Sequence, residues 1–276
     1  MRLLFVLVLA STVAGAYTVD SVAPRCGDVI QVRGDAVAAR MNGRTVPLFA
    51  GSGPARAGLM PVPLEEKPGK YPLEFLGTDG RVAGTVEITV REPHYPKQNI
   101  VIGKEKKELR PSPGETETVR AFRETVSATR YWEEPFVLPV RGCMTSPFGV
   151  ARLHNGQPTG SYHRGLDQRG ATGTPVRAIA AGIVKVARMF NLHGGTIGID
   201  HGQGLTSMYL HLSKLAAEEG VHVEKGAVIG YVGTTGFSTA PHLHWALYAH
   251  GVSVSPLQWV QLKPCAAPVR GKKKSR

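Results

Sequence analysis

The sequence has few cysteines and no long apolar stretch. Its cysteines, Cys26, Cys143 and Cys265, are scattered through 276 residues, and none has a partner at the spacing of a zinc finger or of a nucleophile motif. The apolar run from Leu3 to Leu9 is too short for an ordinary membrane span, and no other stretch approaches about twenty uninterrupted apolar residues. Neither a cysteine-bound metal nor a transmembrane helix is therefore predicted.

The beginning of the chain has the pattern of an export signal. Arg2 gives a basic start, an apolar run follows, and Ala14-Gly15-Ala16 is a small-residue cleavage pattern, so residues 1–16 are predicted to be a secretory signal peptide. No cysteine lies at the cleavage point, which argues against a lipoprotein anchor. We therefore expect a soluble, exported protein that begins near Tyr17 and acts in the periplasm or outside the cell.

Acidic residues are scarce relative to basic ones. The chain has 33 lysines and arginines against 21 aspartates and glutamates, a formal net charge of +12. Such a charge favours association with polyanions, which outside the inner membrane are wall polymers, anionic lipids and lipopolysaccharide. The basic tail over residues 263–276 would also suit nucleic acid, but the export signal argues against that partner. Weak adhesion to anionic envelope polymers is the expectation.

Side chains that bind zinc gather in three clusters of the second half: His163 with Asp167, then His211, then His242 with His244. Zinc in a hydrolase takes three protein ligands and leaves a fourth position for water, whose pKa the metal lowers to about 7. The five side chains exceed that requirement. Three are expected to hold metal while two handle protons, and the spacing alone leaves the third ligand open.

Local patterns place these side chains. Pro241 and the apolar residues after His244 indicate a strand entered from a turn, so His242 and His244 share one face while Leu243 points into the core. The cluster from His163 to Asp167 lies on a turn-rich connection, where ligands can bend towards a common point. No His-Glu-x-x-His helix is present, so a thermolysin-like mechanism is not supported.

A second strand is predicted over residues 205–212. Its alternation sets Tyr209 and His211 on one face and Leu210 and Leu212 on the other. The Tyr209 ring either packs in the core or brings its hydroxyl to the site. The remaining histidines are assigned to surface or core positions without a chemical role; they are His94, His154, His193, His201, His222 and His250.

At these clusters the sequence resembles the lysostaphin-type zinc metallo-endopeptidases, or LytM domains, which cut peptides in bacterial cell walls. The resemblance runs from about Gly142 to Trp259, through Thr145-Ser146-Pro147-Phe148-Gly149, His163-Arg164-Gly165-Leu166-Asp167, Gly173-Thr174-Pro175-Val176, Ile199-Asp200-His201-Gly202, Tyr209-Leu210-His211-Leu212 and Pro241-His242-Leu243-His244. It implies that His163, Asp167 and His244 bind one zinc ion and that His211 and His242 are unliganded catalytic histidines. The sequence departs from the family at Ala240, where members usually carry glycine before the proline.

The expected fold is mainly β: an antiparallel lysostaphin-like metallopeptidase domain over residues 140–262, preceded by a small β-sandwich over residues 17–92. A charged linker over residues 93–139 joins them, with a helix over about 115–130. The sandwich either binds the wall, covers the active cleft or only spaces the catalytic domain. Because chain ends of a domain often lie close together, Cys143–Cys265 is the preferred disulfide, with Cys26 free; other pairings stay open.

The function that these features predict is hydrolysis of peptide cross-links in peptidoglycan by a metal-activated water. One alternative is a binding protein of the same fold that activates or positions other wall hydrolases. Such members typically lose metal ligands, whereas this chain keeps all of them. A zinc hydrolase acting on secreted proteins is a further alternative. The lack of an obvious repeat module for thick walls favours a periplasmic enzyme, while the bond cleaved, the regulatory partners and the oligomeric state are not readable.

Overall fold

The computed structural model describes residues 17–266 except residues 52 and 94. The predicted signal peptide and the basic end of the tail lie outside the described residues. Strands dominate the described chain, together with the short helices α1 (Lys104–Glu108) and α2 (Glu115–Arg123) and a 3-10 turn at Pro256–Gln258. The mainly-β prediction is confirmed. No helix among these residues is long and apolar enough to cross a membrane.

The first body is a sandwich of two four-stranded antiparallel sheets, ordered β1-β2-β6-β5 and β4-β3-β7-β8. Its strands are β1 Tyr17–Val19, β2 Val29–Gly34, β3 Ala38–Met41, β4 Arg44–Pro47, β5 Phe49–Ala50, β6 Arg56–Pro61, β7 Gly69–Leu76 and β8 Val82–Val90. Inward residues such as Ile30, Val32, Leu73, Phe75 and Ile88 are fully buried between the sheets. They recur at every second position, which is the period that one buried face of a strand requires.

The second body is built on a large sheet with the order β10-β13-β21-β17-β16-β15-β19, to which β22 adds beside β21. Two small sheets, β14-β20-β18 and β12-β11-β9, flank it. The strands are β9 Lys97–Ile100, β10 Met144–Ser146, β11 Ala151–His154, β12 Gln157–Tyr162, β13 Leu166–Arg169, β14 Pro175–Arg177, β15 Gly182–Met189, β16 Gly195–Gly202, β17 Leu205–Leu212, β18 Lys214–Leu215, β19 His222–Val223, β20 Val228–Tyr231, β21 His242–Ala249 and β22 Val252–Val254.

The large sheet buries apolar side chains on both faces, and β21 shows how they are divided. Leu243, Trp245 and Leu247 point into the main core, whereas Ala246 and Tyr248 point into a smaller core that α2 covers with Val119 and Phe122. His242 and His244 fall on the same face as Ala246 and Tyr248 because strand side chains alternate. The two histidines therefore lie on the α2 side of the sheet, next to the smaller core that α2 covers.

The helix in the linker is shorter than predicted, ending at Arg123 rather than near residue 130. After the C-cap residue Glu124 come Thr125, Val126 and Ser127, which are poor helix formers. Val126 is exposed, and the backbone turns instead to pair Ser127 O with the N–H of Gln203 at 2.7 Å. The linker also contains strand β9 and helix α1, which the sequence pattern did not predict.

Cys143 and Cys265 form a disulfide, which confirms the preferred pairing. Their strands and loops meet because Cys265 N–H donates to Met144 O at 2.8 Å, beside Cys143. Cys26 is free and buried in the sandwich. The bridge thus closes the peptidase domain on itself, across a sequence separation of 122 residues.

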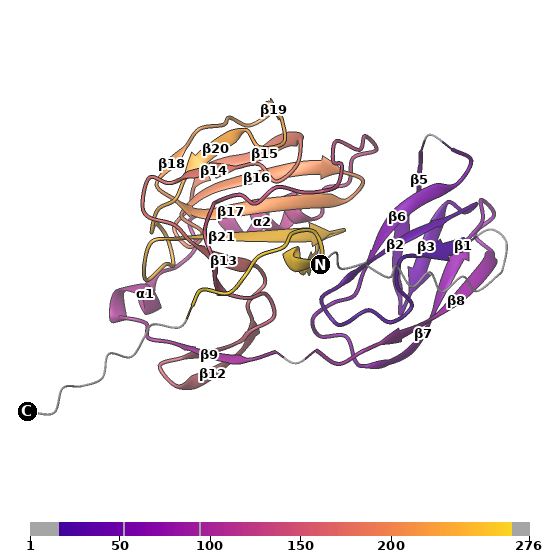
Figure 1. Ribbon diagram of the computed structural model, residues 1–276, viewed down its shortest axis with the longest axis horizontal. Helices are drawn as coiled ribbons and strands as arrows, with labels where there is room; N and C mark the ends of the chain where they lie inside the picture. Colours follow the sequence, from indigo (N-terminus) through magenta and orange to yellow (C-terminus); the bar gives the residue numbers. More distant parts are fainter. Residues whose placement is uncertain (1–16, 52, 94, 267–276) are drawn as a thin grey trace, which may run out of the picture.

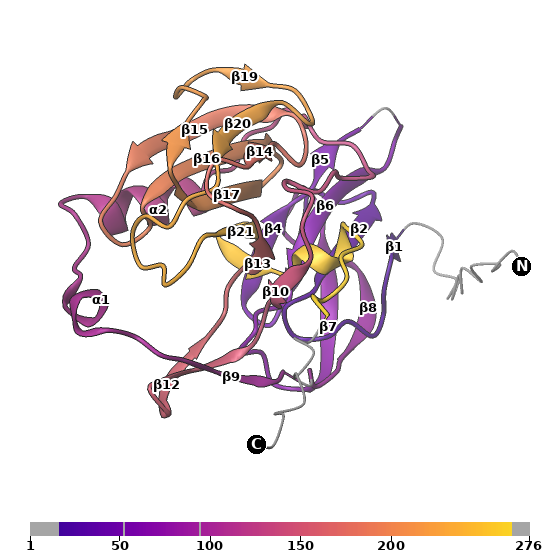
Figure 2. The same cartoon turned by 60° about the vertical axis from the view of Figure 1, so that its left-hand side comes forward.

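The two bodies are in direct contact (Figures 1 and 2). The Gln258 side chain accepts from Val29 N–H at 2.7 Å and donates to Val29 O at 3.1 Å. It thus pairs with β2 beyond the end of β1, as a neighbouring strand would. Val29 also joins the main peptidase core with Trp132, Phe136 and Trp259, whose rings pack together. The sandwich is therefore attached through apolar and backbone contacts.

Candidate metal centre

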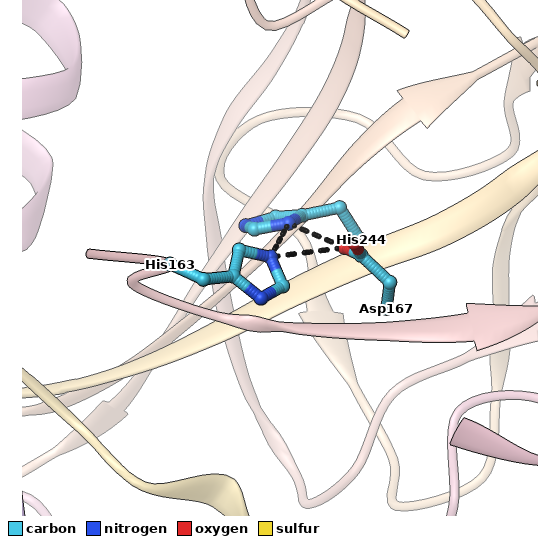
Figure 3. A group of neighbouring side chains, drawn as sticks. All are labelled: His163, Asp167 and His244. Carbon is cyan, nitrogen blue, oxygen red and sulfur yellow. Dashed lines mark hydrogen bonds and ion pairs between the residues drawn. The ribbon is translucent and has the colours of Figure 1, made fainter. Parts of the chain in front are cut away.

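Three of the predicted site residues converge at the end of the large sheet. Asp167 on β13 pairs in register with His244 on β21, and His163 lies in the turn just before β13. Asp167 Oδ1 lies 2.9 Å from His244 Nδ1 and 3.1 Å from His163 Nε2, and the two ring nitrogens are 3.0 Å apart (Figure 3). Gly165 makes this possible, since a Cβ there would lie 2.5 Å from His244 Nε2.

The donor set fits a zinc ion. Two imidazole nitrogens and one carboxylate oxygen are the ligand types that zinc takes in hydrolases. Bonds of about 2.0–2.1 Å at tetrahedral angles put neighbouring ligand atoms about 3.3 Å apart. The three separations here are 2.9, 3.0 and 3.1 Å, slightly shorter than that value. The three ligand atoms therefore already face one another at nearly the spacing that a zinc ion requires. His163, Asp167 and His244 form the metal-capable group found among the described residues.

Hydrogen bonds on the outer side of the group fix the orientation of these candidate ligands. His163 Nδ1–H donates to Pro147 O at 2.9 Å, which directs Nε2 at Asp167 and His244. Burial alone would raise the pKa of Asp167, but His163 and His244 outweigh it and hold the pKa well below its usual range. Arg152 lies 3.3 Å from the second carboxylate oxygen, Oδ2. The carboxylate is therefore ionised and offers Oδ1 inward.

His242 lies beside the group without joining it. Its Nδ1–H donates to Ala240 O at 2.7 Å, so Nε2 is the free nitrogen, 3.7 Å from Asp167 Oδ1. The ring is 5.2 Å from the ring of His211, centroid to centroid. Ala240 thus supplies the carbonyl that orients His242.

His211 reaches the same place by a break in strand β17. Its φ angle is +63°, which is uncommon for a residue other than glycine, and the pairing of β17 with β16 shifts register between Leu212 and Tyr209. This is a β-bulge, in which one extra residue is left unpaired and the strand bends. Leu210 and His211 consequently both line the cavity, although they are consecutive.

The predicted alternation along β17 is therefore wrong beyond Tyr209. Leu212 packs with Tyr209 in the main core, while Leu210 packs on the α2 side. The bulge at His211 inserts one residue into the alternation and moves Leu212 to the face of Tyr209. Tyr209 itself is a core residue: its hydroxyl accepts from Ile179 N–H at 3.0 Å and does not line the cavity.

The His211 ring is held by the loop after β20. Its Nδ1–H donates to Thr235 O at 2.9 Å, and its backbone N–H donates to His193 O at 3.1 Å. Burial first, and then the nearby His244 and His242, lower the pKa of His211 to about 3. Gly233 lets the loop approach, because a Cβ there would lie 2.7 Å from His211 O. His211 is thus a neutral imidazole with a free Nε2.

His193 lines the cavity and Glu115 binds its ring; neither was singled out from the sequence. Glu115, the first residue of α2, is fully buried and accepts from the backbone N–H groups of residues 191–193 and from His193 Nδ1 at 2.6 Å. Burial raises its pKa, but these bonds, led by His193, outweigh it and lower the pKa to about 2. Ser112 followed by Glu115 has capping-box spacing, which is the signal that could have identified it.

The site opens into a cavity of about 830 Å³. Its wall includes the proposed metal ligands with His211 and His242, together with His154 and His193, which the sequence had placed in structural roles. The linker contributes residues 98–101. No residue of the sandwich, as far as the described residues 17–92 go, lines this cavity, so in this structure the sandwich does not cover it.

Several known proteins resemble this chain. The profile of Peptidase family M23 matches residues 161–256. The DD-carboxypeptidase/endopeptidase Mpg of Neisseria meningitidis is 40% identical over 114 residues, which are 41% of this chain and 26% of Mpg. Lysostaphin of Staphylococcus simulans is 41% identical over 101 residues, 36% of this chain and 20% of lysostaphin. The chain thus matches about a quarter or less of these curated relatives.

A solved structure extends the similarity to the first body. A putative M23 peptidase from Pseudomonas aeruginosa is 28% identical, with a TM-score of 0.66 over 86% of this chain and 94% of that chain. The match therefore includes most of the sandwich as well as the large sheet. The resemblance seen in the sequence motifs is confirmed: residues 161–256 form a domain of Peptidase family M23.

Proposed function

We propose that this protein is a zinc-dependent endopeptidase that hydrolyses peptide cross-links of bacterial peptidoglycan. The observation that carries the proposal is the combination of a three-ligand group, His163, Asp167 and His244, with two further imidazoles, His211 and His242, whose free Nε2 atoms share the cavity. Relatives named as a DD-carboxypeptidase/endopeptidase, a peptidoglycan DD-endopeptidase and lysostaphin support the substrate class.

The three ligands would hold the ion through His163 Nε2, Asp167 Oδ1 and His244 Nδ1. Zinc bound there supplies a water of lowered pKa and polarises the scissile carbonyl. Two neutral imidazoles and one carboxylate leave the site with net positive charge, which suits the oxyanion that develops during attack. Asp167 is already ionised, so it needs no deprotonation when metal binds.

His211 and His242 are proposed to move protons. Each has Nδ1–H fixed on a backbone carbonyl, so each neutral ring offers its Nε2 lone pair in the tautomer that these bonds select. One accepts a proton from the attacking water, and a protonated imidazole donates to the oxyanion or to the leaving amine. Overall, the water oxygen forms a C–O bond with the carbonyl carbon, the peptide C–N bond breaks, and the amine leaves with the proton taken from the water. Which histidine serves which step is left open.

The charge of the cavity suits the acidic peptides of peptidoglycan. Arg152 lines its wall, and Asp167 is the single carboxylate that the described residues bring to the lining. The formal net charge of +12 adds attraction to anionic envelope polymers. We infer that the protein is exported and acts in the periplasm or outside the cell, with peptidoglycan peptides as its partner.

Digestion of purified peptidoglycan tests the proposal. The zinc-loaded protein is incubated with sacculi and with isolated cross-linked muropeptides, and mass analysis identifies the released fragments. We expect loss of cross-linked dimers for the wild type and turnover lower by about two to four orders of magnitude for His242→Ala, the usual worth of a positioned acid-base group. Undigested dimers with the zinc-loaded wild type would contradict the proposal.

A cellular assay separates an enzyme from an activator of other hydrolases. His242→Ala is expected to keep the fold and zinc, because Leu243 carries the core packing of that strand. If cells with this variant divide normally although it cuts no muropeptide, the activator alternative is correct. If cellular function is lost together with catalysis while zinc content stays the same, the protein works as a hydrolase.

A further inference from the structure

Gln98 lies on β9, in the linker and outside the residues that match the family profile. Strand β9 pairs in parallel with β11, and the register sets Gln98 opposite Arg152. Both side chains line the cavity that holds the proposed metal ligands. A residue from the connecting segment is thus built into the wall of the site.

The Gln98 amide oxygen accepts two hydrogen bonds. Arg152 Nη1 donates to Oε1 at 2.6 Å, and Ser146 Oγ donates to the same atom at 2.8 Å. A guanidinium has no acceptor. The atom that faces Arg152 must therefore be the oxygen of the amide, so chemistry fixes the orientation of the side chain.

The first branch of this network runs to Asp167. Arg152 uses Nη2 to contact Asp167 Oδ2 at 3.3 Å, while Oδ1 faces His163 and His244. A guanidinium free to turn prefers two parallel hydrogen bonds to both oxygens of a carboxylate. Gln98 occupies Nη1 and so keeps Arg152 on Oδ2 alone, which leaves Oδ1 for a metal ion.

The second branch runs to His163. Ser146 is buried, and its Oγ lies 3.2 Å from His163 Nδ1, on the edge of the ring opposite Nε2. The Nδ1–H group donates to Pro147 O at 2.9 Å, and because Ser146 gives its own hydrogen to Gln98, a lone pair of Oγ faces Nδ1–H as a second, longer acceptor. This arrangement favours the tautomer with a free Nε2, the nitrogen that would bind metal.

We propose that Gln98 is a positioning residue of the metal centre, anchoring Asp167 through Arg152 and His163 through Ser146. The inference rests on the proposed function, since it takes zinc as the ion at this site. Outer partners that orient metal ligands typically contribute about 10–100-fold in metal affinity. On this view the linker completes the metal centre besides joining the domains.

Zinc affinity of the full-length protein, measured by competition with a chelator, tests the proposal. Gln98→Ala is expected to weaken zinc binding by about 10–100-fold, because Arg152 is released and Ser146 loses its acceptor. Gln98→Glu should restore affinity to within a few-fold of the wild type, since a carboxylate accepts from the same two donors. Thermal unfolding of each metal-free variant checks that the fold is retained.

Asn99→Ala is the matched control. Asn99 is the next residue of β9, and its side chain accepts from Gly156 N–H at 2.7 Å without touching a metal ligand. We expect its zinc affinity to equal that of the wild type. Equal losses for Gln98→Ala and Asn99→Ala would mean that only docking of β9 matters, and unchanged affinity for Gln98→Ala would also overturn the proposal. The readout is binding, so the comparison stands even if the protein hydrolyses no muropeptide.

Discussion

Asp167 and His244 are cross-strand neighbours on β13 and β21, and the register that pairs them places Asp167 Oδ1 2.9 Å from His244 Nδ1. A slip of one residue would turn both side chains to the other face of the sheet, because side chains alternate along a strand. The buried neighbours Leu166 and Leu243 oppose such a slip, since it would expose them. The same packing that builds the core therefore positions two of the three proposed metal ligands.

His244→Ala and His211→Ala are expected to separate metal binding from proton transfer. His244→Ala removes a ligand, so zinc content of the purified protein should fall well below one ion per chain. His211→Ala should keep zinc but lower turnover by about two to four orders of magnitude. Elemental analysis and a muropeptide assay measure both properties. Full zinc occupancy in His244→Ala would show that the ligand assignment is wrong.

Glu115→Ala is expected to disturb the site from a distance. It leaves the backbone N–H groups of residues 191–193 without their buried acceptor, and His193 O is the partner of His211 N–H. We expect a loss of about 2–4 kcal/mol in the free energy of unfolding, with lower turnover and nearly normal zinc content.

Glu117→Ala is the control for that change, because Glu117 is an exposed glutamate of the same helix. It should alter the free energy of unfolding by less than about 0.5 kcal/mol. Urea unfolding measures both variants. Similar changes in the free energy of unfolding for Glu115→Ala and Glu117→Ala would mean that the buried hydrogen bonds of Glu115 do not stabilise the fold.

Acid should destabilise the protein through buried histidines such as His201. It is fully buried, and this burial lowers its pKa to about 4, with Ala181 O only partly opposing the shift. The unfolded chain, with a histidine pKa of about 6.5, binds the proton first. Stability from this residue is therefore complete above pH 6.5 and is lost as the pH falls towards 4, by about 3 kcal/mol in total.

Urea midpoints at several pH values between 7 and 4 measure this dependence. His201→Gln cannot take up a proton, so its stability should fall less steeply with acid than that of the wild type, whatever its stability at pH 7. Parallel pH profiles for the two proteins would assign the acid sensitivity to other groups.

The Cys143–Cys265 disulfide is expected to stabilise the peptidase domain. It closes a loop with a sequence separation of 122 residues, and cross-links of that length contribute about 2–5 kcal/mol by restricting the unfolded chain. Cys143→Ser with Cys265→Ser should lower the melting temperature, and reductant should do the same to the wild type but not to the double variant. Cys26→Ser is the control that leaves the bridge intact. A wild type indifferent to reductant would contradict the expectation.

Much of the candidate site follows from local sequence patterns. His242, Leu243 and His244 alternate as a strand must, so the shared face of the two histidines needed no knowledge of the fold. The disulfide pairing followed from the nearness of domain ends. These features depend on residues close in sequence, or on a rule that holds for most compact domains.

Other parts of the site depend on contacts between distant segments. The bulge at His211 is stabilised by the carbonyls of His193 and Thr235. No residue type in strand β17 predicts this bulge. Gln98 and Arg152 are 54 residues apart, and Glu115 and His193 are 78 residues apart. The sequence determined which side chains are able to bind metal and which strands carry them. Only the tertiary structure decided which carbonyls orient the rings and which buried polar groups hold the ligands, because those partners meet only when the sheets have packed.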